Sequence, residues 1–171
     1  MSTNQTALFV LSRCTKMRDV IIDTNVFVLY LAGRINTNQI YRYCRNALYT
    51  EDDYHFLVNL LGNFDRIITC PNVLTEIDNL LNRITGDDKY TYLLLAKEIY
   101  TQSIEKYIAT DTVSKEWYFS ELGLTDSVLL MMASDSDLLI SADSALCDYA
   151  KSMGIETFDF KEYLNEKLLL S

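Results

Sequence analysis

The segment VIIDTN at residues 20–25 constrains the fold of this chain more than any other stretch. Its three apolar residues show no alternation with polar ones, which is typical of a strand buried on both faces in a parallel α/β sheet. Ligands of open α/β sheets bind at the carboxyl ends of the strands, and Asp23 is expected at such an end. Asp23 could instead cap a helix that begins near Val26, and the residues alone leave both interpretations open.

Short apolar runs alternate with helical spacings through most of the 171 residues. Gly33 is expected to end the first helix, Pro71 fits the first turn of a later one, and Thr125 is expected to cap another. The pattern around residues 117–119 is irregular and predicts no element. The alternation predicts an α/β protein, a three-layer α/β/α sandwich with a central, mostly parallel sheet. The expected strands are 20–22, 66–70, 138–141 and 155–158, and the expected helices are 26–32, two within 37–61 (the second from 51), 71–84, 88–109, 126–133, 144–153 and 161–169.

Length and composition predict one domain with a substantial core. The net charge of −9 argues against nonspecific electrostatic binding of nucleic acid, unless bound cations or a local basic patch compensate. The four cysteines are scattered, which favours reduced structural thiols in a cytoplasmic protein and not a cysteine-based zinc site. No apolar stretch approaches the length of a membrane span, and residues 7–11 are too short for a signal-peptide core. The sequence therefore predicts a cytoplasmic protein without a membrane partner.

Four acidic residues occupy the places where such a sheet presents chemistry: Asp23, Glu76, Asp126 and Asp143. Each also has a structural interpretation, because Glu76 could be a solvated helix residue, Asp126 a favourable first-turn charge and Asp143 a cap. The apolar run VLLMMA behind Asp126 predicts a deeply buried helix. Carboxylates gathered there would repel one another without cations, so their joint placement favours an ion-binding acidic site.

Four segments carry a family resemblance: VIIDTNVFVLYLAG, CPNVLTEIDNLL, LGLTDSVLLMMA and LLISADSALCDYAKSMGI. In this order they resemble the motifs of the PIN domain family of nucleases, over residues 19 to about 158. The resemblance implies a metal-dependent endoribonuclease whose acidic tetrad is Asp23, Glu76, Asp126 and Asp143, with Asn25 and Ser141 in supporting roles. It also implies an RNA substrate and products with 5′-phosphate and 3′-hydroxyl ends.

Oxygen ligands suit Mg²⁺ or Mn²⁺, one or two of which would activate a water for attack on phosphorus. We expect Asp23 and Asp126 to be direct ligands, and Glu76 and Asp143 to act through water or to complete a second site. Ser141 and Asn25 would orient carboxylates or water. His55, the only histidine, is expected to be an ordinary helix residue and not a catalytic base.

The PIN-like domain is expected over residues 17–171, with residues 1–16 as an N-terminal extension or an added edge strand and Met17 as an alternative start. A toxin paired with an antitoxin peptide is a regulatory version of the nuclease, and a homodimer is also open. The rival from another class is a catalytically inactive PIN-like scaffold or partner-binding module. The basic residues best suited to an RNA path, each also explained as a solvated surface charge, are Arg34, Arg42, Arg45, Arg83 and Lys89.

Overall fold

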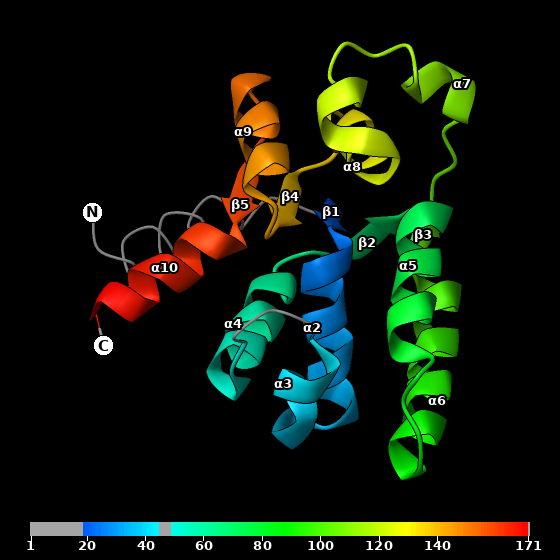
Figure 1. The fold of residues 1–171 in the computed structure, drawn as a ribbon, viewed down its shortest axis with the longest axis vertical. Helices are drawn as coiled ribbons and strands as arrows, with labels where there is room; N and C mark the ends of the chain where they lie inside the picture. The colour runs from blue at the N-terminus through cyan, green and yellow to red at the C-terminus, as the bar shows by residue number, and fades with distance from the viewer. Residues whose placement is uncertain (1–18, 45–48, 171) are drawn as a thin grey trace.

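The computed structural model describes residues 19–44 and 49–170, which contain a five-stranded sheet flanked by helices (Figure 1). The strand order is β3-β2-β1-β4-β5, and every neighbouring pair is parallel. The predicted α/β sandwich is confirmed, with a sheet that is parallel throughout. The strands are β1 (Asp19–Ile22), β2 (Arg66–Thr69), β3 (Ile104–Glu105), β4 (Leu138–Ser141) and β5 (Thr157–Asp159).

The core lies on both faces of the two central strands. In β1, Val20 and Ile21 are 0% exposed, and all four residues of β4 are buried. Ile21 is in register with Ile68 of β2 on one side and with Leu139 of β4 on the other. Apolar side chains buried above and below the sheet explain why β1 shows no polar alternation.

Helices cover both faces of the sheet. On one face α2 packs against α4, α5 and α6, and on the other α8 packs against α9 and β1. None of the helices in the described ranges is long and apolar enough to cross a membrane. The helices are α2 (Thr24–Ile35), α3 (Ile40–Tyr43, after the 3₁₀ turn Thr37–Gln39), α4 (Glu51–Leu61), α5 (Pro71–Leu81), α6 (Asp87–Gln102), α7 (Thr110–Val113), α8 (Phe119–Ala133), α9 (Ser144–Ser152) and α10 (Phe160–Leu170).

The prediction that Gly33 ends the first helix is wrong. Helix α2 continues to Ile35, and Gly33 is buried inside it. A Cβ atom at this position would lie 2.1 Å from Cδ2 of the Tyr54 ring. Gly33 is therefore needed for the close approach of α4 to α2.

The prediction of one helix over residues 88–109 is also wrong. Helix α6 ends at Gln102, and β3 adds a fifth strand beside β2. Two residues are too few to show a strand period, and the spacing of Ile104 and Tyr107 fits a helix equally well. The helix expected at 71–84 ends at Leu81, three residues early. The predicted extension at residues 1–16 and the start at Met17 lie outside the described residues. The first helix expected within 37–61 is wrong in extent, because it is a 3₁₀ turn followed by α3, which ends at Tyr43 where Cys44 adopts extended backbone angles.

Candidate functional site

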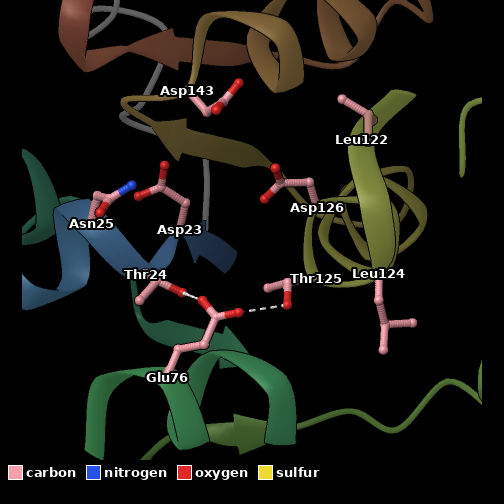
Figure 2. A pocket seen from close by; sticks show the side chains of 9 residues that line it. All are labelled: Asp23, Thr24, Asn25, Glu76, Leu122, Leu124, Thr125, Asp126 and Asp143. Carbon is pink, nitrogen blue, oxygen red and sulfur yellow. Dashed lines mark hydrogen bonds between the residues drawn. The ribbon is translucent and has the colours of Figure 1, made fainter. Parts of the chain in front are cut away.

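The strand order reverses at β1, because the chain first adds β2 and β3 on one side and then β4 and β5 on the other. At such a switch point the carboxyl ends of the two central strands leave a crevice, which is the usual ligand site of open α/β sheets. Here the crevice is a cavity of about 340 Å³ (Figure 2). It is lined by Asp23, Thr24, Asn25, Glu76, Leu122, Leu124, Thr125, Asp126 and Asp143. All four predicted acids thus line one cavity.

Asp23 directly follows β1 and is 3% exposed. Its Oδ1 accepts a hydrogen bond from the Val26 N–H at 2.8 Å, which caps α2. Its Oδ2 accepts from the Ser141 hydroxyl at 2.5 Å and from the Ala142 N–H at 2.9 Å. The two interpretations of Asp23 therefore hold together, since the residue caps a helix and also faces the cavity.

Ser141, at the end of β4, lies behind Asp23 and is 0% exposed. Its hydroxyl donates to Asp23 and accepts a hydrogen bond from the Asp143 N–H at 2.9 Å. Ser141 thus fixes the Asp23 carboxylate without lining the cavity. Asn25 does line the cavity and is exposed, but Figure 2 shows no hydrogen bond between it and the other labelled residues.

Asp143 follows β4 by two residues and caps α9, because its Oδ1 accepts a hydrogen bond from the Leu146 N–H at 3.0 Å. As with Asp23, the capping role predicted as an alternative coexists with a place on the cavity wall. Both acids are thus held at a strand end by the N–H groups of the helix that follows.

Asp126 reaches the cavity because α8 is kinked at Gly123, whose φ of 73° and ψ of −172° are non-helical. This combination of angles is essentially restricted to glycine. Asp126 lies in the first turn after the kink, and the buried run from Ser127 holds that part of the helix in the core. The prediction of Thr125 as an N-cap is wrong, because Thr125 lies within α8 and its hydroxyl points to α5.

Glu76 joins two helices through its carboxylate. Its Oε2 accepts a hydrogen bond from the Thr24 hydroxyl and its Oε1 accepts one from the Thr125 hydroxyl, both at 2.7 Å (Figure 2). Sequence reasoning missed this bridge. The only hint of the bridge in the sequence is that each threonine is adjacent to a predicted acid: Thr24 follows Asp23, and Thr125 precedes Asp126. Their common partner is 52 and 49 residues away, beyond the reach of a local pattern.

Two of the four carboxylates, those of Asp126 and Asp23, have raised pKa values. The pKa of Asp126 is raised to about 7, first by burial and then by the charges of Asp143, Asp23 and Glu76. Burial also raises the pKa of Asp23, although three hydrogen bonds oppose the effect. In Figure 2 no other labelled residue donates a hydrogen bond to Asp126. The cavity therefore concentrates negative charge that the surrounding side chains do not neutralise.

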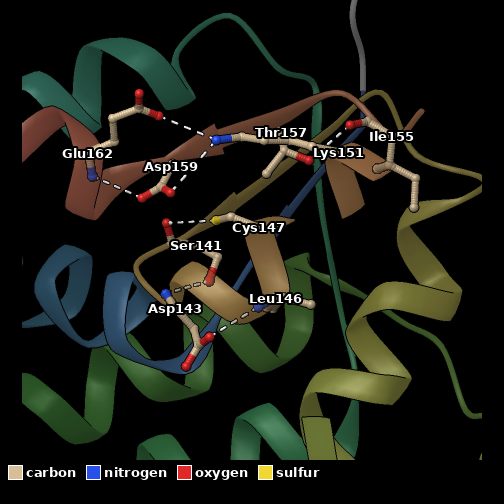
Figure 3. A network of polar contacts seen from close by, with 9 residues as sticks. All are labelled: Ser141, Asp143, Leu146, Cys147, Lys151, Ile155, Thr157, Asp159 and Glu162. Carbon is tan, nitrogen blue, oxygen red and sulfur yellow. Dashed lines mark hydrogen bonds and ion pairs between the residues drawn. The ribbon is translucent and has the colours of Figure 1, made fainter. Parts of the chain in front are cut away.

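At the tip of β5, on the same edge of the sheet, acidic side chains are paired with a lysine, unlike those in the cavity (Figure 3). There the Lys151 ammonium lies 3.8 Å from an Asp159 carboxylate oxygen and 3.3 Å from one of Glu162. Among the described residues, no lysine or arginine forms such an ion pair with the four acids of the cavity. The acids at β5 thus have a lysine as partner, whereas those after β1 and β4 have no such partner in the part of the chain that the structure describes.

The donor set of the cavity fits a hard divalent cation, since it consists of carboxylate, hydroxyl and amide oxygens. Within residues 19–44 and 49–170, no three His, Cys, Asp or Glu side chains come together closely enough to hold one ion. Mg²⁺ commonly binds proteins through one or two carboxylates and keeps several waters. The cavity therefore fits a largely hydrated ion better than one enclosed by all four acids.

Other predicted residues lie elsewhere. His55 is on α4, where its side chain is 59% exposed and 3.5 Å from Glu51, and it does not line the cavity. Arg34 pairs with Glu98 in the last turn of α2, about 15 Å along the helix from the cavity at its start. Three cysteines, Cys44, Cys70 and Cys147, are buried free thiols, and the other lies outside the described residues.

No protein-family model matches this sequence, and no curated protein matches it either. The geometry of the cavity therefore carries the functional argument.

Proposed function

We propose that this protein is a metal-dependent endoribonuclease of the PIN type, with its active site in the cavity between β1 and β4. The observation that carries the proposal is the meeting of four carboxylates from four separate segments in one cavity, where no lysine or arginine of residues 19–44 and 49–170 forms an ion pair with them. Holding like charges together raises the free energy of the folded state unless a cation binds there. Such an arrangement is expected of an ion site and not of scaffolding.

Asp23 and Asp126 are the residues that we expect to hold the ion, for different reasons. Asp23 is fixed by three hydrogen-bond donors, so its carboxylate presents an ordered oxygen. The pKa of Asp126 is raised first by burial and then by its acidic neighbours, and a bound cation would stabilise the charged carboxylate against both effects. Asp143 lines the same cavity, and we expect its carboxylate to bind the ion through water or to hold a second ion.

The remaining residues would position these ligands and the RNA. Ser141 holds Asp23, and Glu76 ties the start of α2 to α8 through two threonine hydroxyls. Leu122 and Leu124 add apolar side chains to the lining of the cavity on the α8 side. When bound, Mg²⁺ or Mn²⁺ supplies an activated water and neutralises charge that develops on the phosphoryl and leaving oxygens.

The proposal includes an RNA substrate, products with 5′-phosphate and 3′-hydroxyl ends, and a cytoplasmic location. The net charge of −9 would suit a basic antitoxin peptide as a protein partner, and a second copy of the chain is the other candidate.

The test is incubation of the purified protein with mixed RNAs in Mg²⁺, in Mn²⁺ and in EDTA. We expect cleavage with either metal and none with the chelator. Cleavage that persists in EDTA would contradict the proposed chemistry. A protein that cuts no RNA but captures a partner tightly would support the inactive PIN-like binding module instead.

A further inference from the structure

The carboxyl edge of the sheet continues past the cavity to the edge strand β3. Lys106 follows this strand directly, and its N–H donates a hydrogen bond to the Thr69 carbonyl at 2.8 Å. The backbone at Lys106 is therefore fixed to the end of β2. Two strand spacings separate β3 from β1, which is about 10 Å.

The tip of β3 lies on the Glu76 side of the cavity. Burial is the main cause of the raised pKa of the Cys70 thiol, and the charges of Glu76 and Glu105 both add to it. Cys70 directly precedes α5, which carries Glu76, and Glu105 ends β3. The charges of both glutamates thus reach the Cys70 thiol, and Lys106 follows Glu105 along the chain.

Lys106 and Tyr107 present a cation and an aromatic ring at this position. Tyr107 is 79% exposed, more than any other aromatic side chain of the described residues. No described carboxylate forms an ion pair with Lys106, whereas at the far end of the same edge Lys151 is engaged by Asp159 and Glu162 (Figure 3). A cationic residue next in sequence to an exposed aromatic residue provides the two kinds of group that bind single-stranded nucleic acid, the cation for a phosphate and the ring for a base.

We propose that Lys106 and Tyr107 form the subsite for a nucleotide that flanks the cleaved phosphate in single-stranded RNA. Lys106 binds the backbone phosphate of this nucleotide and Tyr107 stacks on its base. The RNA then runs along the carboxyl edge from β3 to the cavity, over Glu76. This inference rests on the proposed ribonuclease function and adds a substrate class and a direction to it.

The experiment measures binding of a short single-stranded RNA of mixed sequence, with Mg²⁺ present, to the full chain carrying Asp126→Asn, which is expected to slow cutting about a hundredfold or more. Lys106→Gln should reduce the slope of log K against log salt by about 0.7, the value for one phosphate contact on a single strand. Tyr107→Ala should raise Kd at least about fivefold, and Tyr107→Phe should leave it nearly unchanged, since the phenyl ring still stacks.

Two further lysines serve as controls. Lys97, exposed on α6 and also without an ion pair to a described carboxylate, should show no change in salt slope as Lys97→Gln. Lys161 lies at the start of α10, beyond the tip of β5. A loss of slope with Lys161→Gln but not with Lys106→Gln would place the RNA over β5 and overturn this inference.

The two proposals fail in distinguishable ways. If the unmodified protein neither cuts nor binds single-stranded RNA, the proposed function itself is wrong. If it cuts RNA with Mg²⁺ while Lys106→Gln and Tyr107→Ala bind RNA like Lys97→Gln, only the subsite is wrong.

Discussion

The Thr125 hydroxyl donates a hydrogen bond to Glu76 Oε1 at 2.7 Å and so joins α8 to α5 at the rim of the cavity. A hydrogen bond to a charged group contributes roughly 1.5–3 kcal/mol. Thr125→Val keeps the shape of the side chain but removes the donor, and should lower the rate of RNA cleavage by about tenfold or more. Thr125→Ser keeps the donor and should restore most of the rate.

Thr101→Val is the matched control for this pair, because the Thr101 hydroxyl bonds only to carbonyls of its own helix. Its cleavage rate should equal that of the unmodified protein. If Thr125→Ser lost as much activity as Thr125→Val, packing and not the hydroxyl would be the cause.

Asp126→Asn should lower turnover by a factor of about a hundred or more, comparable to the loss of a key electrostatic catalytic group. His55→Ala should leave turnover nearly unchanged, since His55 is exposed on α4 and does not line the cavity. Cleavage rates of both variants under saturating Mg²⁺ provide the measurement. If His55→Ala lost turnover while Asp126→Asn stayed active, the roles assigned to these two residues would be wrong.

Thermal unfolding separates the two aspartates that we expect to bind the ion. In EDTA, Asp126→Asn should stabilise the fold by something on the order of 1 kcal/mol, because it removes one of the mutually repelling carboxylates. Asp23→Asn should destabilise it, because the amide NH₂ would face donors from Val26, Ser141 or Ala142. Millimolar Mn²⁺ should raise the melting temperature of the natural sequence by mass action, and that of either variant much less. If Mn²⁺ changed the melting temperature of none of the three proteins (the natural sequence, Asp126→Asn and Asp23→Asn), the ion site would be ruled out.

The pH dependence of stability follows from the pKa of Asp126, which is about 7 in the folded state and 3.8 as the ordinary value. Between these values the folded state binds more protons than the unfolded one, so the free energy of unfolding falls as pH rises from about 4 to about 7. Since Asp126 is partly exposed, solvent screening limits its contribution to the order of 1 kcal/mol. Urea unfolding in EDTA at pH 5 and pH 8 should show this loss. Asp126→Asn should show a smaller loss, and an equal loss in both proteins would contradict the assigned pKa.

Gly123→Ala should destabilise the protein by roughly 1–3 kcal/mol, since φ and ψ of Gly123 lie in a region that other residues rarely adopt. No atom lies within 4 Å of a Cβ built there, so the cost is backbone strain and not a clash. Gly62→Ala is the control, because Gly62 has right-handed helical angles and its nearest atoms are 3.5 Å away. Chemical denaturation of the two variants compares them directly. Equal stabilities would show that α8 does not need the kink.

Parts of this architecture follow from the sequence because they depend on local chemistry. Runs such as residues 20–22 and 138–141 are apolar without alternation, since both faces of a central parallel strand are buried. Asp23 and Asp143 could be placed at the same edge because the carboxyl ends of parallel strands share one edge of the sheet. The meeting of Asp23 and Asp143 was therefore predictable from topology.

Other parts depend on tertiary contacts that no local pattern reports. From the sequence, Gly33 is expected to end a helix. Its place inside α2 is explained by the Tyr54 ring, which packs where a Cβ atom would lie. Strand β3 is too short to show a period, and its two residues fit the end of a helix equally well. The hydroxyl bridge to Glu76 joins three segments, and its two threonines could not be matched to Glu76 before the fold was known.

The bond between Ser141 and Asp23 spans 118 residues of the chain. A ribosome that adds about 5–20 residues per second takes about 6 to 24 s to make that length. During this interval β1 can pair with β2, but β4, which supports Asp23 from behind, has not yet been synthesised. An emerging chain therefore cannot assemble the cavity before β4 has been synthesised, and any activity that depends on the cavity begins only after that point.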